Sequence, residues 1–144
     1  NIHVILVGDG EEKTRLEQQA SGLKNITFTG KQSNMGDWFS AADLLVHSSY
    51  SEGLGSVILE AIGAGLPVIG SNAGGIPDII DHEVSGLLFE SGNAHELANA
   101  IARVVEDDDL RQKLTAGGQE KLKAFDITHT SKLYLDIYRS LQGE

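Results

Sequence analysis

The 144-residue sequence contains no cysteine and only two prolines, and aromatic residues make up 6% of it. Without cysteine the chain forms neither disulfides nor thiolate metal sites, which favours a cytoplasmic location. No apolar run approaches the roughly 18 residues that a membrane-spanning helix needs, so we expect no direct membrane insertion. Basic residues are scarce, 11 against 21 acidic ones, and the net charge of -10 argues against binding to nucleic acid.

The composition is otherwise that of a folded protein with a hydrophobic core. Apolar residues make up 40% of the sequence, and a chain of this length is expected to form a single domain over residues 1–144. The sequence begins with Asn1, directly before the apolar run Ile2–Val7. Since a natural protein seldom starts inside a buried strand, we interpret the chain as a fragment of a longer protein.

Short apolar runs alternate with helical patterns, as in the βα units that build a parallel sheet. The expected strands are Ile2–Val7, Ile26–Thr29, Leu44–Ser48, Pro67–Gly70 and Gly86–Phe89. The expected helices are Glu11–Leu23, Met35–Ala42, Ser56–Ala64, Ala94–Glu106, Leu110–Ala124 and Thr128–Leu141. The fold class is therefore α/β, a Rossmann-like, doubly wound parallel sheet of about five strands with helices on both faces. Such sheets bind ligands beyond the carboxyl ends of their strands.

The last expected helix carries an apolar stripe. Tyr134, Ile137, Tyr138 and Leu141 recur at helical spacing on one of its faces. The favoured interpretation is core contact with the sheet, and the alternative is contact with a missing part of the protein.

The strongest functional pattern involves two carboxylates around a glycine-flanked turn. Glu52 and Glu60 stand eight positions apart, with Gly53-Leu54-Gly55 following Glu52. We expect Glu52 in a strand-to-helix loop and Glu60 on the first turns of the helix.

Backbone N–H groups would complete this site. Those of Gly55, Ser56 and Val57 lie at the expected helix start, where an anion such as a phosphate is attracted. Carboxylates accept hydrogen bonds from sugar hydroxyls. A polyol together with a phosphate indicates a nucleotide-sugar.

Three more loops follow expected strands. Gly8-Asp9-Gly10 resembles half of a dinucleotide fingerprint, although a plain tight turn explains it equally well. Gly30 and Lys31 form either a simple strand exit or a backbone contact with a nucleobase. In Gly74-Gly75 two adjacent glycines let a ligand approach the backbone closely, with a flexible turn as the alternative.

Other catalytic chemistries fit less well. The histidines are His3, His47, His82, His95 and His129, and no pair has metal-ligand spacing. Each is expected to be structural or at the surface, with His47 set apart because it lies near the end of the third expected strand. A hydrolytic pair of Glu52 and Glu60 is disfavoured, because a loop and its following helix seldom place carboxylates on opposite sides of a bond.

Taken in order, these residues resemble a known family. The matching motifs are Val7-Gly8-Asp9-Gly10, Phe28-Thr29-Gly30, Ala42-Asp43, Glu52-x7-Glu60, Gly65-Leu66-Pro67-Val68, Gly74-Gly75-Ile76-Pro77 and Gly86-Leu87-Leu88. They resemble the C-terminal, donor-binding domain of retaining glycosyltransferases with the GT-B fold, specifically glycosyltransferase family 4. The resemblance extends as far as the expected helix Ala94–Glu106.

The resemblance implies transfer of a sugar from a UDP-, GDP- or ADP-linked donor to an acceptor, with retention of configuration and without a metal or cofactor. It implies that Glu52 is the catalytic residue facing the donor sugar and that Glu60 holds the ribose hydroxyls. The other implied donor-binding residues are Gly53, Leu54, Gly55, Ser56, Val57, Gly8, Gly30 and Lys31. The alternatives are a non-catalytic nucleotide-sugar-binding or regulatory module, and a nucleotide-sugar epimerase.

The sequence departs from the family at its start. The family's domain begins with another strand and helix, the strand being central in the order 3-2-1-4-5-6, and their loop supplies an arginine and a lysine to the diphosphate. Two charge-assisted contacts, each worth roughly 1.5–3 kcal/mol, are thus expected to be missing. We therefore expect the chain to be inactive without its N-terminal acceptor domain. Ile2–Val7 and Leu44–Ser48 either pair directly or leave a slot that another chain fills by strand exchange or dimerisation.

Overall fold

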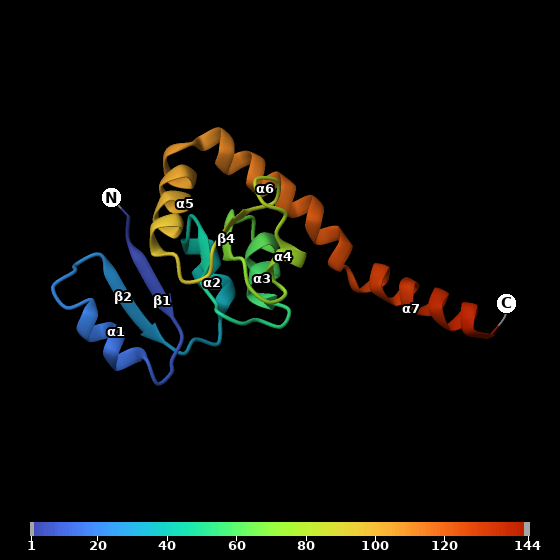
Figure 1. Cartoon of the computed structure of the whole chain (residues 1–144), viewed down its shortest axis with the longest axis horizontal. Coiled ribbons are helices and arrows are strands. Elements are labelled where there is room, and N and C mark those ends of the chain that lie inside the picture. The colour runs from blue at the N-terminus through green and yellow to red at the C-terminus, as the bar shows by residue number, and fades with distance from the viewer. Residues whose placement is uncertain (1, 143–144) are drawn as a thin grey trace. The chain divides into compact units, whose positions relative to one another are not determined.

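The computed structural model describes residues 2–142 (Figure 1). The chain divides into two compact units, Asn1–Trp38 and Phe39–Glu144, and each is described by itself. All five expected strands are present, and every strand pairing is parallel, which confirms the α/β class.

The first unit is a βαβ arrangement. β1 (Val4–Val7) and β2 (Ile26–Gly30) form a two-stranded parallel sheet, with α1 (Lys13–Gln19) between them in the chain. The four residues of β1 are all exposed, and α1 has no buried residue. The expectation that both faces of each strand are covered is therefore wrong for β1. This strand pairs along one edge only, and α1 alone is too polar and too short to bury it.

The second unit is built on a three-stranded parallel sheet in the order β3-β4-β5. Its strands are β3 (Leu45–His47), β4 (Val68–Ser71) and β5 (Leu87–Phe89). Its helices are α3 (Ser56–Gly63), α4 (Ile76–Ile79), α5 (Ala94–Glu106), α6 (Asp108–Leu122) and α7 (Ile127–Gln142), with the 3₁₀ turn η1 (Lys123–Phe125) before α7. Helix α2 (Met35–Ala41) contains the point at which the chain passes from the first unit to the second. Every residue of β4 is buried, so both faces of this central strand are covered, because successive side chains point to opposite faces.

The core of the second unit lies between the sheet and two long helices. Ile69 of β4 and Leu87 of β5 pack with Val104 of α5 and Leu114 of α6, and each is almost fully buried. The amphipathic pattern of α5 explains this packing, since its apolar residues recur at helical spacing on the face toward the sheet.

Truncating Leu114 tests this core. We expect Leu114→Ala to lower the free energy of unfolding by about 3 kcal/mol, because the side chain is fully buried and a cavity would remain. Leu141→Ala on α7 is the matched control. That side chain is 77% exposed, so its truncation is expected to change stability by less than about 0.5 kcal/mol. Both free energies of unfolding are measured by urea denaturation. Equal losses in the two variants would contradict the placement of Leu114 in the core.

Local capping sets the boundary between α5 and α6. The Asp107 side chain accepts a hydrogen bond from the N–H of Leu110 at 2.9 Å, as an N-cap does. Helix α6 therefore begins at Asp108, two residues before the expected start. Helix α4 was not expected, since four residues carry no periodic signal, although Pro77 in its first turn suits a helix start.

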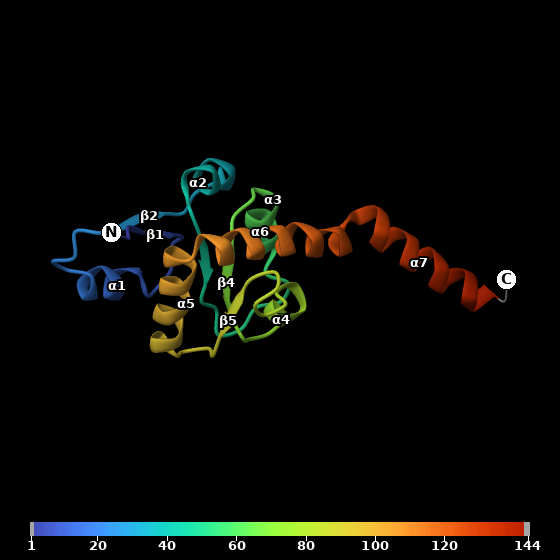
Figure 2. The ribbon, with the colours of Figure 1, turned by 90° about the horizontal axis from the view of Figure 1, so that it is seen from above.

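The apolar stripe of α7 does not contact the sheet. Its side chains are all more than half exposed: Tyr134, Ile137, Tyr138 and Leu141. Both views show α7 extending away from the sheet of its unit (Figures 1 and 2). The favoured interpretation of this stripe as core contact is therefore wrong, and contact with another part of the protein stays a prediction.

β1 and β3 belong to separate sheets, so the direct pairing considered for these two strands is not formed. The slot filled by another chain remains a prediction, as does a single domain over residues 1–144. None of the helices within residues 2–142 combines the length and the apolar character needed to cross a membrane.

Candidate functional site: the loop after β3 and the start of α3

The loop after β3 fixes the first of the two glutamates through its side chain. His47, the last residue of β3, places its Nε2 atom 3.0 Å from Oε2 of Glu52. The other carboxylate oxygen, Oε1, accepts the N–H of Gly53 at 3.1 Å. Both oxygens of Glu52 are thus held, and the side chain remains 32% exposed at the carboxyl edge of the sheet.

The backbone of this loop is held by the loop after β4. The N–H of Gly75 donates to the carbonyl oxygen of Glu52 at 3.0 Å. A Cβ on Gly74 would overlap that same oxygen, and a Cβ on Gly75 would overlap the carbonyl oxygen of Gly53. The backbone of the Glu52 loop therefore accounts for the two glycines, and the approach of a ligand that the sequence suggested stays a prediction.

The start of α3 offers unpaired backbone donors. Gly55 caps the helix in the left-handed region, with φ of 63°, and its carbonyl oxygen accepts the N–H of Ile58. Among the described residues, the N–H groups of Ser56 and Val57 have no hydrogen-bond acceptor. Helix N-termini of this kind bind phosphate and other anions.

The second glutamate lies on the solvent side of α3. The helix buries Ile58, Ala61 and Ile62 against the core. Glu60 is exposed on the opposite side, three and four residues after Val57 and Ser56, which places the three on one helical face. Within residues 2–142 its carboxylate has no partner, so it is available to hydroxyl donors.

The hydrogen bond from His47 lowers the pKa of Glu52 below its ordinary value of 4.5. The backbone amides of Gly53 and Gly55 act in the same direction, while partial burial opposes them. Because the folded pKa is depressed, the pair contributes stability above pH 4.5 and loses it as the pH falls through the folded value.

This assignment predicts the titration of one carboxyl group. We expect the side-chain carboxyl carbon of Glu52, followed by ¹³C NMR, to titrate at a lower pH in the folded chain than in the same chain unfolded in urea. A folded midpoint equal to or above the unfolded one would show that the carboxylate is not held as described.

The remaining predicted donor residues belong to the first unit. The N–H of Gly8 donates to the carbonyl oxygen of Gly30 at 2.9 Å, so these two glycines adjoin at the carboxyl edge of β1 and β2. The ammonium of Lys13 lies beside Gly30 and 3.8 Å from the carboxylate of Asp9. Lys31 is exposed. Their part in a donor site shared with Glu52 stays a prediction.

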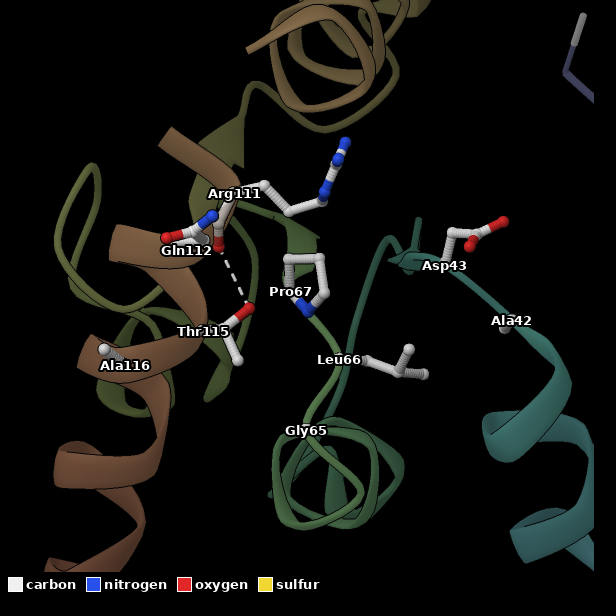
Figure 3. Close-up of a pocket in the computed structure, with 9 residues that line it drawn as sticks. All are labelled: Ala42, Asp43, Gly65, Leu66, Pro67, Arg111, Gln112, Thr115 and Ala116. Atoms are coloured by element: carbon white, nitrogen blue, oxygen red, sulfur yellow. Dashed lines mark hydrogen bonds between the residues drawn. The ribbon is translucent and has the colours of Figure 1, made fainter. Parts of the chain in front are cut away.

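A separate hollow of about 480 Å³ lies elsewhere in the second unit (Figure 3). Asp43 before β3, Pro67 before β4 and Arg111 of α6 border it. These positions precede the strands, whereas Glu52 follows one, so the hollow lies at the amino edge of the sheet. Ligands in doubly wound sheets bind at the opposite edge, and we do not assign the donor to this hollow.

Nowhere in the described part of the chain do three or more histidine, aspartate or glutamate side chains gather as a metal site would require. Within residues 2–142 the only side-chain partner of Glu52 is His47, which the sequence had not paired with it. Its position at the carboxyl end of β3 was the one signal available.

A parallel sheet with carboxylates and helix N–H groups at its carboxyl edge is typical of nucleotide-binding α/β proteins. Residues 1–121 match the family of glycosyl transferases group 1, and the chain belongs to this family. It is 40% identical over 142 residues to the lipopolysaccharide core biosynthesis glycosyltransferase LpsD of Rhizobium meliloti, covering 96% of this chain and 41% of that protein. It is also 36% identical over 113 residues to a D-inositol 3-phosphate glycosyltransferase of a Nocardioides species, covering 78% of this chain and 25% of the relative.

Solved structures show the same fold. Anabaena Alr3699/HepE in complex with UDP superposes with a TM-score of 0.87 at 31% identity, over 96% of this chain and 41% of that one. The same protein in complex with UDP-glucose gives 0.84. The C-terminal domain of the glycosyl transferase group 1 protein LpcC from Francisella tularensis gives 0.69 at 29% identity, over 81% of this chain and 62% of that domain. The chain thus has the fold of the C-terminal half of GT-B glycosyltransferases, and it spans between a quarter and about two fifths of the length of its longer relatives.

Proposed function

We propose that this chain is the donor-binding part of a retaining glycosyltransferase that uses a UDP-sugar. The observation that carries the proposal is the arrangement at the start of α3. The N–H groups of Ser56 and Val57 and the carboxylate of Glu60, which have no partner among the described residues, share one helical face, and the loop before them holds Glu52. The choice of uracil rests on the structural relative that binds UDP and UDP-glucose.

The residues divide the donor between them. Within the segment from Gly53 to Val57, the amides of Ser56 and Val57 bind the diphosphate, and that of Gly53 holds Glu52 for the sugar. Glu60 accepts hydrogen bonds from the ribose hydroxyls. Glu52 faces the donor sugar. Contact of Gly30 and Lys31 with the base stays a prediction.

Retention of configuration follows when the acceptor attacks the anomeric carbon from the same face of the sugar that the leaving diphosphate occupies. An acceptor hydroxyl forms a bond to the anomeric carbon while the bond from that carbon to the β-phosphate oxygen breaks. The departing phosphate oxygen takes the hydroxyl proton, so the products are the glycosylated acceptor and UDP. The protein's part is to orient the sugar and to stabilise the charge that develops on the diphosphate.

In this proposal a second domain binds the acceptor. The chain covers 41% of LpsD, which leaves room in such a protein for a whole further domain. We assign acceptor binding to that domain and the exposed stripe of α7 to contact with it.

Calorimetric titration of the 144-residue chain with UDP, GDP and ADP tests the proposal. We expect UDP to bind best, with a dissociation constant on the order of 10 μM or weaker, about −7 kcal/mol, since the segment from Gly53 to Val57 contains no lysine or arginine to pair with the diphosphate. Glu60→Ala should weaken the binding of all three nucleotides, because they share the ribose that Glu60 holds. Equal, unsaturable heats for the three nucleotides would contradict nucleotide binding, and nanomolar binding would show that charge-assisted contacts with the diphosphate matter little.

A further inference from the structure

The reaction proposed above does not by itself require a histidine beside Glu52, yet the fold places one there. His47 ends β3, five residues before Glu52, and its side chain is only 22% exposed. We propose that His47 is a positioning residue, which holds the Glu52 carboxylate in the orientation that the donor sugar meets. This inference rests on the proposed function, because it deepens the role of the same site.

The contact geometry gives His47 a distinct part. Glu52 is held at three points, by His47 through Oε2, by the N–H of Gly53 through Oε1, and by the N–H of Gly75 through its backbone carbonyl. The contact with Gly75 involves the backbone alone, so any residue at position 52 would make it. The contacts with Gly53 and His47 need a side-chain oxygen, and among the described residues His47 is the side chain that fixes the rotation of the carboxylate.

The hydrogen bond also defines the state of the ring. A carboxylate only accepts hydrogen bonds, so Nε2 of His47 must carry the hydrogen in this contact. Each oxygen of Glu52 uses one lone pair on its partner within the chain and keeps another. The carboxylate can therefore be held by His47 and still accept a hydroxyl of the sugar.

Few other groups of the described chain act on the Glu52 carboxylate. In the described part of the chain, the groups that act on the Glu52 carboxylate are His47 and the backbone amides of Gly53 and Gly55. Glu60 on α3 and Asp78 on α4 are exposed, and neither is among the described groups that act on the pKa of Glu52. The pKa of Glu52 is lowered chiefly by the His47 bond, which agrees with the geometry. A bound donor would exclude water from the pair and strengthen it further.

Two substitutions separate the hydrogen bond from the bulk of the ring. His47→Gln keeps an N–H donor near the position of Nε2, whereas His47→Leu fills similar space without one. In the complete enzyme we expect His47→Leu to lower kcat about tenfold or more, with little change in the KM for the donor, and to move the acid limb of the pH profile upward. His47→Gln should recover most of kcat and keep the acid limb near its original position. His95→Leu, at an exposed position on α5, is the matched control and should leave kcat unchanged.

The outcomes distinguish this inference from the proposed function. If Glu52→Gln loses turnover while His47→Leu retains kcat and its acid limb, His47 does not position Glu52, and the inference is overturned. A loss that is equal in His47→Leu and His47→Gln would overturn it too, because packing of the ring would then explain the effect. If Glu52→Gln itself retains turnover, the proposed function fails. The inference is then decided by ¹³C titration of Glu52, whose midpoint rises in His47→Leu only if His47 holds the carboxylate.

Discussion

Replacing Glu60 with alanine is expected to reduce sugar transfer by the complete enzyme by roughly two to three orders of magnitude. Glu60 is exposed on α3, and its carboxylate has no partner within the described residues, so its role is not structural. In the proposed complex it accepts hydrogen bonds from two ribose hydroxyls. Hydrogen bonds to a charged group are worth roughly 1.5–3 kcal/mol each, and each 1.36 kcal/mol is a factor of ten in rate.

The experiment measures kcat/KM for the donor in Glu60→Ala and in a control. Glu106→Ala is suitable as the control, because Glu106 is also an exposed glutamate at a helical position and lies at the end of α5. We expect the control to retain full activity and both variants to unfold at similar temperatures. Turnover of Glu60→Ala within about threefold of the parent would refute its assignment to the ribose, since less than 1 kcal/mol would then be involved.

Replacing Gly74 with alanine is expected to cost about 3 kcal/mol of stability and to displace the Glu52 loop. Gly74 adopts a φ of 55°, which an alanine reaches only at a cost of roughly 1–2 kcal/mol. The added Cβ would also overlap the carbonyl oxygen of Glu52, so the two loops could not keep their present separation. The stability loss and a loss of activity should therefore occur together.

Gly63→Ala provides the matched control for this change. Gly63 ends α3, and a Cβ there would lie 3.8 Å from a side-chain carbon of Leu122, an ordinary contact. We expect this variant to be as stable as the parent, or more stable by up to about 1 kcal/mol, because alanine favours the helix. The free energy of unfolding of each variant is measured with denaturant. If Gly74→Ala were as stable as Gly63→Ala, the tight packing of the loops after β3 and β4 would be contradicted.

Periodicity in the sequence was sufficient for much of the fold. Helix α5 has the expected bounds, Ala94–Glu106, because a long amphipathic pattern follows an asparagine cap. The five short apolar runs are strands within a few residues of their expected bounds. The pattern could not show what covers an apolar face. Thus β1 and the stripe of α7 are apolar as expected but lie exposed, because burial depends on partners that periodicity does not identify.

The candidate site was predictable where one continuous segment encodes it. The spacing of Glu52 and Glu60 across a glycine turn placed one in a loop and the other on a helix, as the structure has them. The contacts that hold the loop were not predictable in this way. His47 reaches Glu52 from the strand, and Gly75 reaches it from a loop more than twenty residues away, so tertiary structure alone brings them together.

Binding of the donor by the segment from Glu52 to Glu60 can be followed in ¹H–¹⁵N NMR spectra of the chain as UDP-glucose is added. We expect the amides from Gly53 to Val57 to shift progressively, and these shifts to be lost in Glu60→Ala. If those amides do not shift while Thr115 and Ala116 beside the opposite hollow do, the donor does not bind at the start of α3.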